Sequence, residues 1–325
     1  MEGEEPEFSL LSWFAMLFSA GMGIGLVFWT TAEPVSHAYK ATPIHKIGTQ
    51  AAINDAFQFA FFHWGIHAWA VYGIVALVFA YFNFHKGYPG LVSATLVPIF
   101  GEKRMRGPIG SAIDVLAVIA TVTGVAATLG FGALQINEGL HYLFKVPSHF
   151  GTQVIIIIIA TILFSWSAWS GIDKGIKTLS NINMILAFIV LIGLFLVGPT
   201  LYILNTFTNG LGNYIFNFFS MSLRIPMDGG AKFQWVQNWT IFYWAWWVSW
   251  APFVGIFIAR VSRGRTIKEF ILGVLFVPAL VSFFFFAVFG GAAVYLQHSG
   301  IANIAKEATE TATCLLYTSP SPRDG

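Results

Sequence analysis

Charge is scarce in this chain. Asp, Glu, Lys and Arg make up 10% of the 325 residues and hydrophobic residues 56%, whereas roughly 25% of an average soluble domain is charged. This composition indicates an integral membrane protein. The formal net charge is only +2, and the basic residues lie in short loops, which argues against nucleic-acid binding. Cysteine is nearly absent too, and because Cys314 stands alone, an internal disulfide is excluded.

Long apolar runs dominate the sequence instead. A helix that spans a membrane needs about 20 mostly apolar residues, and seven stretches meet this length. No soluble domain fits between them, so we expect a single all-α integral membrane domain over residues 1–313. The predicted spans are residues 9–33, 57–84, 111–140, 152–170, 181–204, 238–259 and 270–296.

Lysine and arginine are distributed unevenly between the two sides of these spans. The loops after the second, fourth and sixth spans hold ten of them, and the loops on the opposite side hold five. Short cytoplasmic loops carry the excess of positive charge. We therefore expect the first residues of the chain to be cytoplasmic.

The two ends of the sequence differ in character from the spans. The opening MEGEEPEFS is typical of a loop within a longer protein and lacks the positively charged region of a signal peptide. At the other end, CLLYTSPSPRDG resembles translated adapter sequence. We expect residues 314–325 to be a non-native tail, with a genuine disordered tail as the alternative.

The first predicted span, LLSWFAMLFSAGMGIGLVFWTTAEP, has Gly21, Gly23 and Gly25 at its centre. Each glycine costs a helix about 1 kcal/mol relative to alanine. One interpretation is close helix packing, because Gly21 and Gly25 form a G-x-x-x-G pair. The other is a discontinuous transporter helix, whose free carbonyls and N–H groups face ions and substrate. The additional Gly23 favours the discontinuous helix.

Aromatic residues form a stripe on the sixth predicted span. At 100° per residue they fall within an arc of about 120°, over a length of roughly half the hydrocarbon thickness. An interfacial belt is the alternative, and it fits Trp239 at the end of the stripe best. The stripe comprises Trp239, Tyr243, Trp246, Trp247, Trp250 and Phe253.

The second span has an aromatic face of its own. Trp64, Trp69 and Tyr72 share an arc of about 140° with Phe57 and Phe61. Two such faces can enclose a quaternary ammonium group, which has no N–H to donate and is recognised by the ring quadrupole. We interpret His63 and His67 as packed or water-facing side chains rather than proton relays.

Acidic residues near the spans bear on the charge of the substrate. We expect all of them at helix ends, away from both aromatic faces, so that a bare cation lacks a protein counter-charge. This favours a zwitterion, whose own carboxylate can meet backbone N–H groups of the glycine segment. The residues are Glu33, Asp55, Asp114, Glu138 and Asp173.

These patterns together resemble the betaine/choline/carnitine transporter (BCCT) family of secondary carriers. The resemblance covers residues 5 to about 300, which correspond to the third through ninth of twelve family helices. It rests above all on WTIFYWAWWVSWAPFVG and is supported by AGMGIGLVFW, FHWGIHAWAVYGIVAL, AIDVLAVIATVTGVAATLGFGALQINEGL and ARVSRGRTIKEFILGVLFVPA.

The resemblance implies a five-plus-five inverted-repeat, leucine-transporter-like fold and a substrate site. By position, the box around the trimethylammonium group consists of Trp64, Trp69, Tyr72 and Trp247. Trp246 and Trp250 line the same pathway, and Gly21, Met22, Gly23 and Gly25 form the unwound segment. A glycine at position 25 is similar to betaine-type members, whereas an acidic residue there favours choline.

The resemblance also implies sites for a coupling sodium ion, the only cofactor-like species expected. One site matches Ser19 and Met22, and the other matches Thr121 and Phe253. A second threonine of that site is replaced by Val125, which removes an oxygen ligand, although Thr123 or Thr128 can rebuild it. Proton coupling and substrate exchange stay open.

The sequence thus predicts a secondary transporter that imports a quaternary-ammonium compatible solute, most simply glycine betaine, across a bacterial plasma (inner) membrane by alternating access. The alternative is a proton-coupled or exchange carrier for choline, carnitine or a sulfonium analogue. A channel or membrane enzyme is a different class, and for an enzyme we find no convergent acid, base or metal ligands in the sequence. The segment 211–222 resembles a family surface helix, and this segment and the WAWW region at 244–247 are the candidates for mediating a homotrimer.

Overall fold

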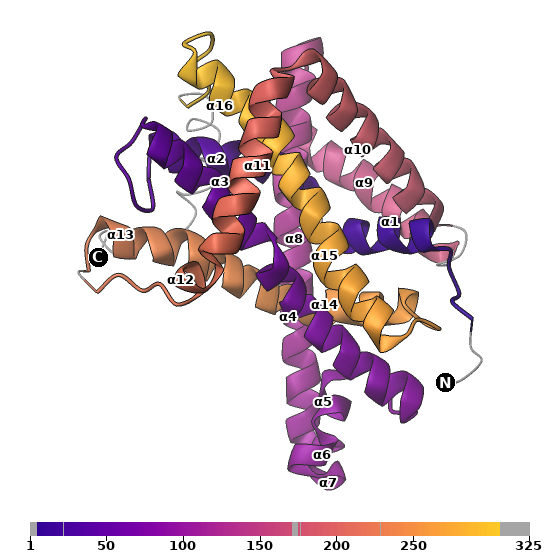
Figure 1. Cartoon of the computed structure of the whole chain (residues 1–325). Coiled ribbons are helices and arrows are strands. Elements are labelled where there is room, and N and C mark those ends of the chain that lie inside the picture. The colour runs from indigo at the N-terminus through magenta and orange to yellow at the C-terminus, as the bar shows by residue number, and fades with distance from the viewer. Residues whose placement is uncertain (1–4, 22, 171–174, 176, 228, 306–325) are drawn as a thin grey trace, which may run out of the picture. The chain divides into compact units, whose positions relative to one another are not determined.

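The structure is a computed structural model that describes residues 5–21, 23–170, 175, 177–227 and 229–305 (Figure 1). All regular structure in these ranges is helical, so the predicted all-α class is confirmed. Met22 and the proposed non-native tail, residues 314–325, lie outside the described residues.

The helices vary widely in length. The longer ones are α1 (Leu10–Gly21), α2 (Ile24–Tyr39), α3 (Gln50–Trp64), α4 (Ile66–Phe79), α8 (Pro108–Phe144), α9 (Phe150–Trp169), α10 (Lys177–Val197), α11 (Thr200–Phe216), α14 (Phe242–Val261), α15 (Ile267–Phe285) and α16 (Gly291–His298). The short ones are α5 (Val92–Thr95), α6 (Val97–Phe100), α7 (Glu102–Met105), α12 (Phe218–Ser222) and α13 (Ala231–Trp235), and π-helical turns cover Ala80–His85, Val236–Ile241 and Phe286–Gly290.

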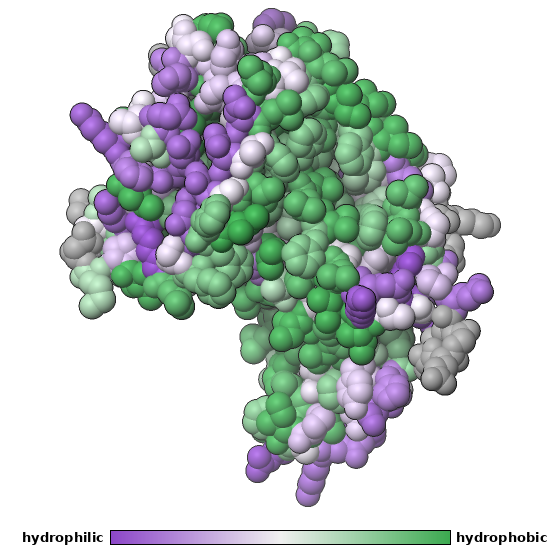
Figure 2. All heavy atoms as spheres, in the orientation of Figure 1, coloured by the Kyte–Doolittle hydropathy of each residue, from purple (hydrophilic) through white to green (hydrophobic). Residues whose placement is uncertain are grey.

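Six helical stretches among the described residues, one of them bent at Gly65, are long and apolar enough to cross a membrane. They match six of the seven predicted spans with shifted ends, and the stretch that matches the fifth predicted span stops at Val197, before the predicted end at residue 204. Figure 2 shows hydrophobic side chains over much of the visible surface, as expected where lipid replaces water. The stretches are Gln50–His85, Pro108–Phe144, Phe150–Trp169, Thr178–Val197, Ala231–Val261 and Ile267–His298.

The first predicted span is not one helix. α1 ends at Gly21, Gly23 forms a bend, and α2 begins at Ile24, so the helix is interrupted where the glycines stand. A Cβ on Gly23 meets no described atom within 4 Å. Close packing by the described residues therefore does not explain a glycine at position 23.

A second interruption was not predicted. The sequence suggested one helix over 57–84, but Gly65 separates α3 from α4. A Cβ on Gly65 lies 2.7 Å from the ring of Phe283 and also clashes with the carbonyl oxygen of Phe61, so a larger residue does not fit. The fifth predicted span, 181–204, is also interrupted: α10 ends at Val197 and α11 begins at Thr200. Pro199 lies between them and has no N–H to continue the hydrogen bonds of the first helix.

The chain divides into two compact units. The first unit comprises residues 1–25, 66–187 and 244–278, and the second comprises residues 26–65, 188–243 and 279–325. In the first unit, the buried indole of Trp13 donates to Ser262 Oγ at 2.9 Å. In the second, α11 packs along α3, and a Cβ on Gly210 lies 2.9 Å from the Phe61 ring. The predicted surface segment 211–222 is the end of α11 followed by α12.

Candidate functional site

Three of the four predicted box residues lie together in the first unit. The ring of Tyr72 on α4 lies 5.9 Å from that of Trp69 and 6.0 Å from that of Trp247 on α14, with interplanar angles of 76° in both pairs. None of the three is more than 2% exposed. The edge-to-face geometry is the one that aromatic pairs prefer. In this conformation the three rings pack against one another.

The two remaining pathway tryptophans extend this group along α14. Trp246 stacks on Trp247 at 5.2 Å and 14°, whereas Trp250 lies 6.0 Å from Phe253. Trp246 and Trp250 are partly exposed. The indole N–H of buried Trp69 has no hydrogen-bond partner among the described residues, which is costly unless a ligand supplies an acceptor.

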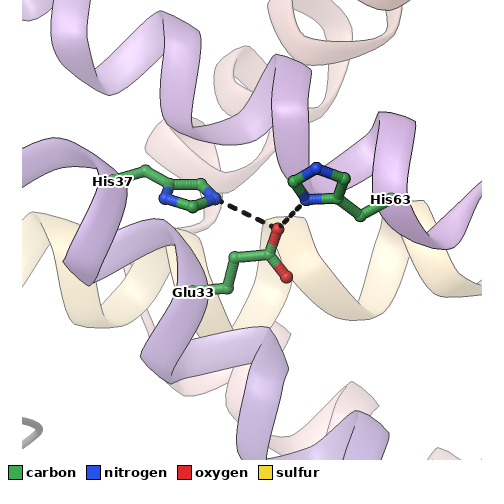
Figure 3. Close-up of side chains that lie close together, drawn as sticks. All are labelled: Glu33, His37 and His63. Atoms are coloured by element: carbon green, nitrogen blue, oxygen red, sulfur yellow. Dashed lines mark hydrogen bonds and ion pairs between the residues drawn. The ribbon is translucent and has the colours of Figure 1, made fainter. Parts of the chain in front are cut away.

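Trp64, the fourth predicted box residue, belongs to the second unit and contacts a buried carboxylate. Its indole N–H donates to Oε2 of Glu33 at 2.9 Å, and the hydroxyl of Tyr243 donates to the same oxygen at 2.7 Å. Oε1 of Glu33 lies 2.6 Å from Nδ1 of His63 and 3.2 Å from Nε2 of His37 (Figure 3). We call these five residues the Glu33 cluster.

The Glu33 cluster corrects two expectations. Glu33 was expected at a helix end, away from the aromatic faces, but it is fully buried and binds one aromatic residue of each face. The reason is that α2 continues to Tyr39, so Glu33 lies within a helix and shares a face with His37 four residues later. The expectation that no acid and base converge was also wrong, because Glu33, His37 and His63 present atoms within 4.8 Å of one another.

Neighbouring side chains complete the cluster. Nε2 of His63 lies 2.9 Å from Oγ1 of Thr240, and the indole of Trp235 donates to Nδ1 of His37 at 3.3 Å. Trp239 is only 8% exposed, and its ring lies 4.5 Å from that of His37. Trp239 therefore packs against the Glu33 cluster and is not exposed as a residue of an interfacial belt is expected to be.

Three ligand-type side chains at this spacing suggest a divalent metal, but the hydrogen-bond directions argue against one. A metal-binding imidazole nitrogen must be free of its proton. Nδ1 of His37 accepts from Trp235, so the proton of neutral His37 is on Nε2, the nitrogen that faces Glu33. The described geometry is that of a carboxylate that accepts hydrogen bonds, not of a ligand set.

The predicted sodium ligands are all in the first unit where they are described. The Thr121 hydroxyl donates to Ala117 O at 2.9 Å, Phe253 is 45% exposed, and Ser19 Oγ is buried without a partner among the described residues. α8 and α14 approach closely nearby, since a Cβ on Gly124 lies 2.9 Å from Cε2 of Trp250. Of the two possible replacements for the missing threonine, Thr123 is exposed and donates to Ile119 O, and Thr128 is partly buried.

The helices and buried aromatic residues define a polytopic membrane protein with an interrupted helix, and sequence comparison gives its family. Residues 1–320 match the family described as BCCT, betaine/carnitine/choline family transporter. The chain belongs to this family of transporters. The expectation that it is not an enzyme is confirmed by its transporter relatives.

Individual relatives are named for several solutes. The chain is 58% identical to the glycine betaine transporter OpuD of Bacillus subtilis, over 95% of this chain and 60% of that protein. It is 45% identical to a probable glycine betaine transporter of Desulfitobacterium hafniense, over 91% of this chain and 58% of that protein. It is 49% identical to an ectoine/hydroxyectoine transporter of Virgibacillus pantothenticus, over 96% and 62%. The chain thus spans about 60% of the length of these relatives.

Proposed function

We propose that the full-length protein carrying this sequence is a secondary transporter that imports glycine betaine by alternating access. The observation that carries the proposal is the buried group of Trp69, Tyr72 and Trp247, with ring centroids 5.9 and 6.0 Å apart. A trimethylammonium group offers no N–H, and a desolvated aromatic site binds it with roughly 2 kcal/mol per cation–π contact. Trp64 is retained as a fourth box residue on the sequence motif, with Trp246 and Trp250 on the pathway.

The carboxylate of betaine needs donors as well. The interruption at Gly23 leaves the first N–H groups of α2, which begins at Ile24, without partners inside the helix, and such N–H groups favour an anion. The buried N–H of Trp69, unpartnered among the described residues, is a second candidate donor. The predicted unwound segment was too long, because Gly21 is the last residue of α1 and Gly25 lies within α2; among its described residues only Gly23 is outside a helix.

The names of the relatives suggest two candidate substrates. The 58% identical relative is named for glycine betaine and the 49% identical relative for ectoine and hydroxyectoine. All three are zwitterions with delocalised or quaternary cationic groups, so ectoine is the second candidate. The prediction that a bare cation lacks a protein counter-charge was wrong, because Glu33 is buried and accepts a hydrogen bond from Trp64. Choline, carnitine and sulfonium analogues are therefore tested as competitors.

Sodium is the coupling ion expected from the sequence, through Ser19 and Met22 at one site and Thr121 and Phe253 at the other. Buried Ser19 Oγ and the approach of α8 to α14 at Gly124 support this part of the proposal. Proton coupling and exchange are the alternatives. Replacing sodium by potassium during uptake separates sodium coupling from both.

We also propose a bacterial plasma (inner) membrane location with a cytoplasmic amino-terminal side, and a homotrimer formed through residues 211–222. The bias of basic residues among the loops supports the orientation. Cysteine-accessibility labelling from either side of the membrane checks the orientation, and cross-linking in native membranes checks the trimer. A monomer in both membrane and detergent contradicts the trimer alone.

The uptake experiment is direct. The full-length gene is expressed in cells that lack betaine carriers, and labelled glycine betaine uptake is measured with and without excess unlabelled substrate. The proposal predicts saturable uptake against a gradient, since a channel only equilibrates the solute. Linear, non-saturating uptake contradicts it.

A further inference from the structure

A cavity of about 600 Å³ lies in the first unit, at the ends of three spanning stretches. The stretch Gln50–His85 ends at this cavity, Ala231–Val261 ends next to it, and Ile267–His298 begins there. We call it the α4–α15 cavity. The end of a span marks the level at which the hydrocarbon core gives way to polar loops, so the cavity lies at the level of the lipid headgroups.

The walls of the α4–α15 cavity are mostly apolar. Leu77 of α4 and Phe84 of the π-helical turn Ala80–His85 line one part, and Ile267 and Phe270 of the first turn of α15 line another. A π-helical turn is a distortion often found at functional sites. Apolar walls gain free energy when a hydrocarbon replaces water against them.

Positive charge gathers at the α4–α15 cavity without an acidic residue to balance it. Arg263 and Arg265 line the cavity, and none of its described lining residues is Asp or Glu. Two acidic residues of the adjoining segments are engaged elsewhere: Glu7 pairs with Arg260 at 2.8 Å, and Glu269 accepts two hydrogen bonds at the start of α15. The unbalanced charge of the cavity favours an anion.

The two arginines of the cavity differ in their partners. The guanidinium of Arg265 donates to Phe8 O at 2.7 Å and lies 4.8 Å from the ring of Trp13. The guanidinium of Arg263 lies 5.9 Å from the ring of Phe84 and makes no hydrogen bond or ion pair with any other described side chain. A guanidinium has five N–H donors in a planar fork that matches a phosphate group. Arg263 therefore offers a phosphate-binding group next to an apolar wall.

We propose that the α4–α15 cavity binds one anionic phospholipid from the leaflet at this end of the spans. Its phosphate binds the guanidinium of Arg263, and an acyl chain lies along Leu77, Phe84 and Phe270. A soluble phosphate gains nothing from apolar walls, and a lipid without net charge gains less from the two arginines. The walls and the charge together select a ligand that is anionic at one end and apolar over the rest.

The turn that carries Arg263 also holds the segment before α1. The backbone N–H of Glu7 donates to Arg263 O at 3.3 Å, and the indole N–H of Trp13 on α1 donates to Ser262 Oγ at 2.9 Å. A lipid that binds this turn therefore stabilises the attachment of α1 to it. Because a ligand that binds only the folded state raises its stability, the melting temperature should rise when the lipid is added. The proposal does not depend on the betaine carrier, since this site is separate from the aromatic group.

Native mass spectrometry of the full-length protein in neutral detergent measures the affinity for single lipids. The probes are dioleoylphosphatidylglycerol, which is anionic, and dioleoylphosphatidylcholine, which has the same chains and no net charge. We expect the wild type to bind one phosphatidylglycerol about tenfold more tightly than phosphatidylcholine, and Arg263→Gln to raise the Kd for phosphatidylglycerol about tenfold. The matched control is Arg104→Gln, which removes the same charge from an exposed position on α7, outside the cavity, and should leave this Kd unchanged.

A second variant and a second measurement test the apolar part of the site. Ala80 lines the cavity, so Ala80→Phe fills it while every charge is kept, and we expect weaker binding of phosphatidylglycerol. A phosphatidylglycerol with a photoreactive diazirine in its acyl chain locates the bound chain directly. We expect it to label residues within 77–85 or 259–270, and Ala80→Phe to reduce this labelling.

Several results would overturn the lipid site. One is an equal Kd for the two lipids, and another is an equal Kd for phosphatidylglycerol in Arg263→Gln and Arg104→Gln. Labelling confined to other residues would show that the cavity is filled by another part of the longer protein or that lipid binds elsewhere. Glycerol 1-phosphate that binds as tightly as phosphatidylglycerol would identify a soluble anion as the ligand instead.

The melting temperature separates this site from the proposed transport function. We expect phosphatidylglycerol to raise it in the wild type and in Arg104→Gln but not in Arg263→Gln, and no rise in the wild type contradicts the site. These measurements need no substrate, so a protein that fails to transport betaine still decides whether the lipid site exists.

Discussion

The indole N–H of Trp64 donates to the carboxylate of Glu33 across 2.9 Å, and both side chains are buried. An aromatic residue proposed to bind substrate is therefore held in place by an anion 31 positions earlier in the chain. The same anion holds Tyr243 on the helix that carries the tryptophan-rich motif.

Removing this anion should destabilise the protein. Glu33→Ala leaves the donors of four side chains without their acceptor, and each unsatisfied buried group costs about 1–3 kcal/mol. We expect the free energy of unfolding to fall by at least about 3 kcal/mol, measured as thermal unfolding of the purified full-length protein. Glu102→Ala is the control, because Glu102 pairs with Arg106 on the surface, where a pair is worth about 0–1 kcal/mol. Equal melting temperatures for the two variants would contradict the cluster.

Substrate affinity should depend on the aromatic group. Trp247→Leu and Trp64→Leu each remove a cation–π contact worth roughly 2 kcal/mol, so we expect the Kd for betaine to rise about 30-fold. Trp247→Phe should lose less, since the ring face remains. Equilibrium binding of labelled betaine measures the Kd of each variant. Trp166→Leu is the control, because this side chain on α9 is 70% exposed. Unchanged affinity for betaine in both Trp247→Leu and Trp64→Leu would refute the aromatic box.

The two helix interruptions should respond differently to alanine. A Cβ on Gly65 lies 2.7 Å from the Phe283 ring, whereas a Cβ on Gly23 meets no described atom within 4 Å. Gly65→Ala should therefore lower stability by about 1–3 kcal/mol through overpacking. Gly23→Ala should leave the melting temperature unchanged but weaken betaine binding. Full binding by a stable Gly23→Ala variant would show that Gly23 does not serve substrate.

The approach of α8 to α14 gives a further prediction. Gly124→Leu forces the Trp250 indole away, because even a Cβ lies 2.9 Å from its Cε2. We expect reduced uptake at normal expression and, if sodium binds beside Thr121 and Phe253, a raised sodium requirement. Val122→Leu, at a side chain that is 61% exposed on the same helix, serves as the control. An unchanged sodium dependence in Gly124→Leu argues against an ion at this helix pair.

Composition and periodicity were sufficient to predict where most of the membrane helices lie. The spans 111–140 and 152–170 became α8 and α9 with small changes at their ends, because apolar length alone determines a membrane helix. The break at Gly23 was predicted from the glycine content, since several glycines in one span disfavour a continuous helix. Gly65 was missed because a single glycine is common in membrane helices, and its effect depends on Phe283, far away in the sequence.

The site was predicted only in part. Trp69 and Tyr72 lie on one face of the second predicted span and Trp247 on the aromatic face of the sixth. Their helical spacing therefore allowed both aromatic faces to be predicted from the sequence. The Glu33 cluster was not found, because Glu33 and His63 are 30 positions apart and Glu33 was placed at a helix end that the structure extends to Tyr39. One signal was present in the sequence: Glu33 and His37 stand four residues apart, the spacing of neighbours on one helix face.

The most direct measurement of the central claim is uptake of labelled glycine betaine by the full-length protein in carrier-deficient cells, with sodium replaced by potassium in a parallel set and with Trp247→Leu at matched expression. The account predicts saturable uptake in the wild type that excess unlabelled betaine abolishes, and a strongly raised substrate requirement in the variant. No saturable uptake of betaine, ectoine, choline, carnitine or a sulfonium analogue, or equal uptake by wild type and Trp247→Leu, would contradict it.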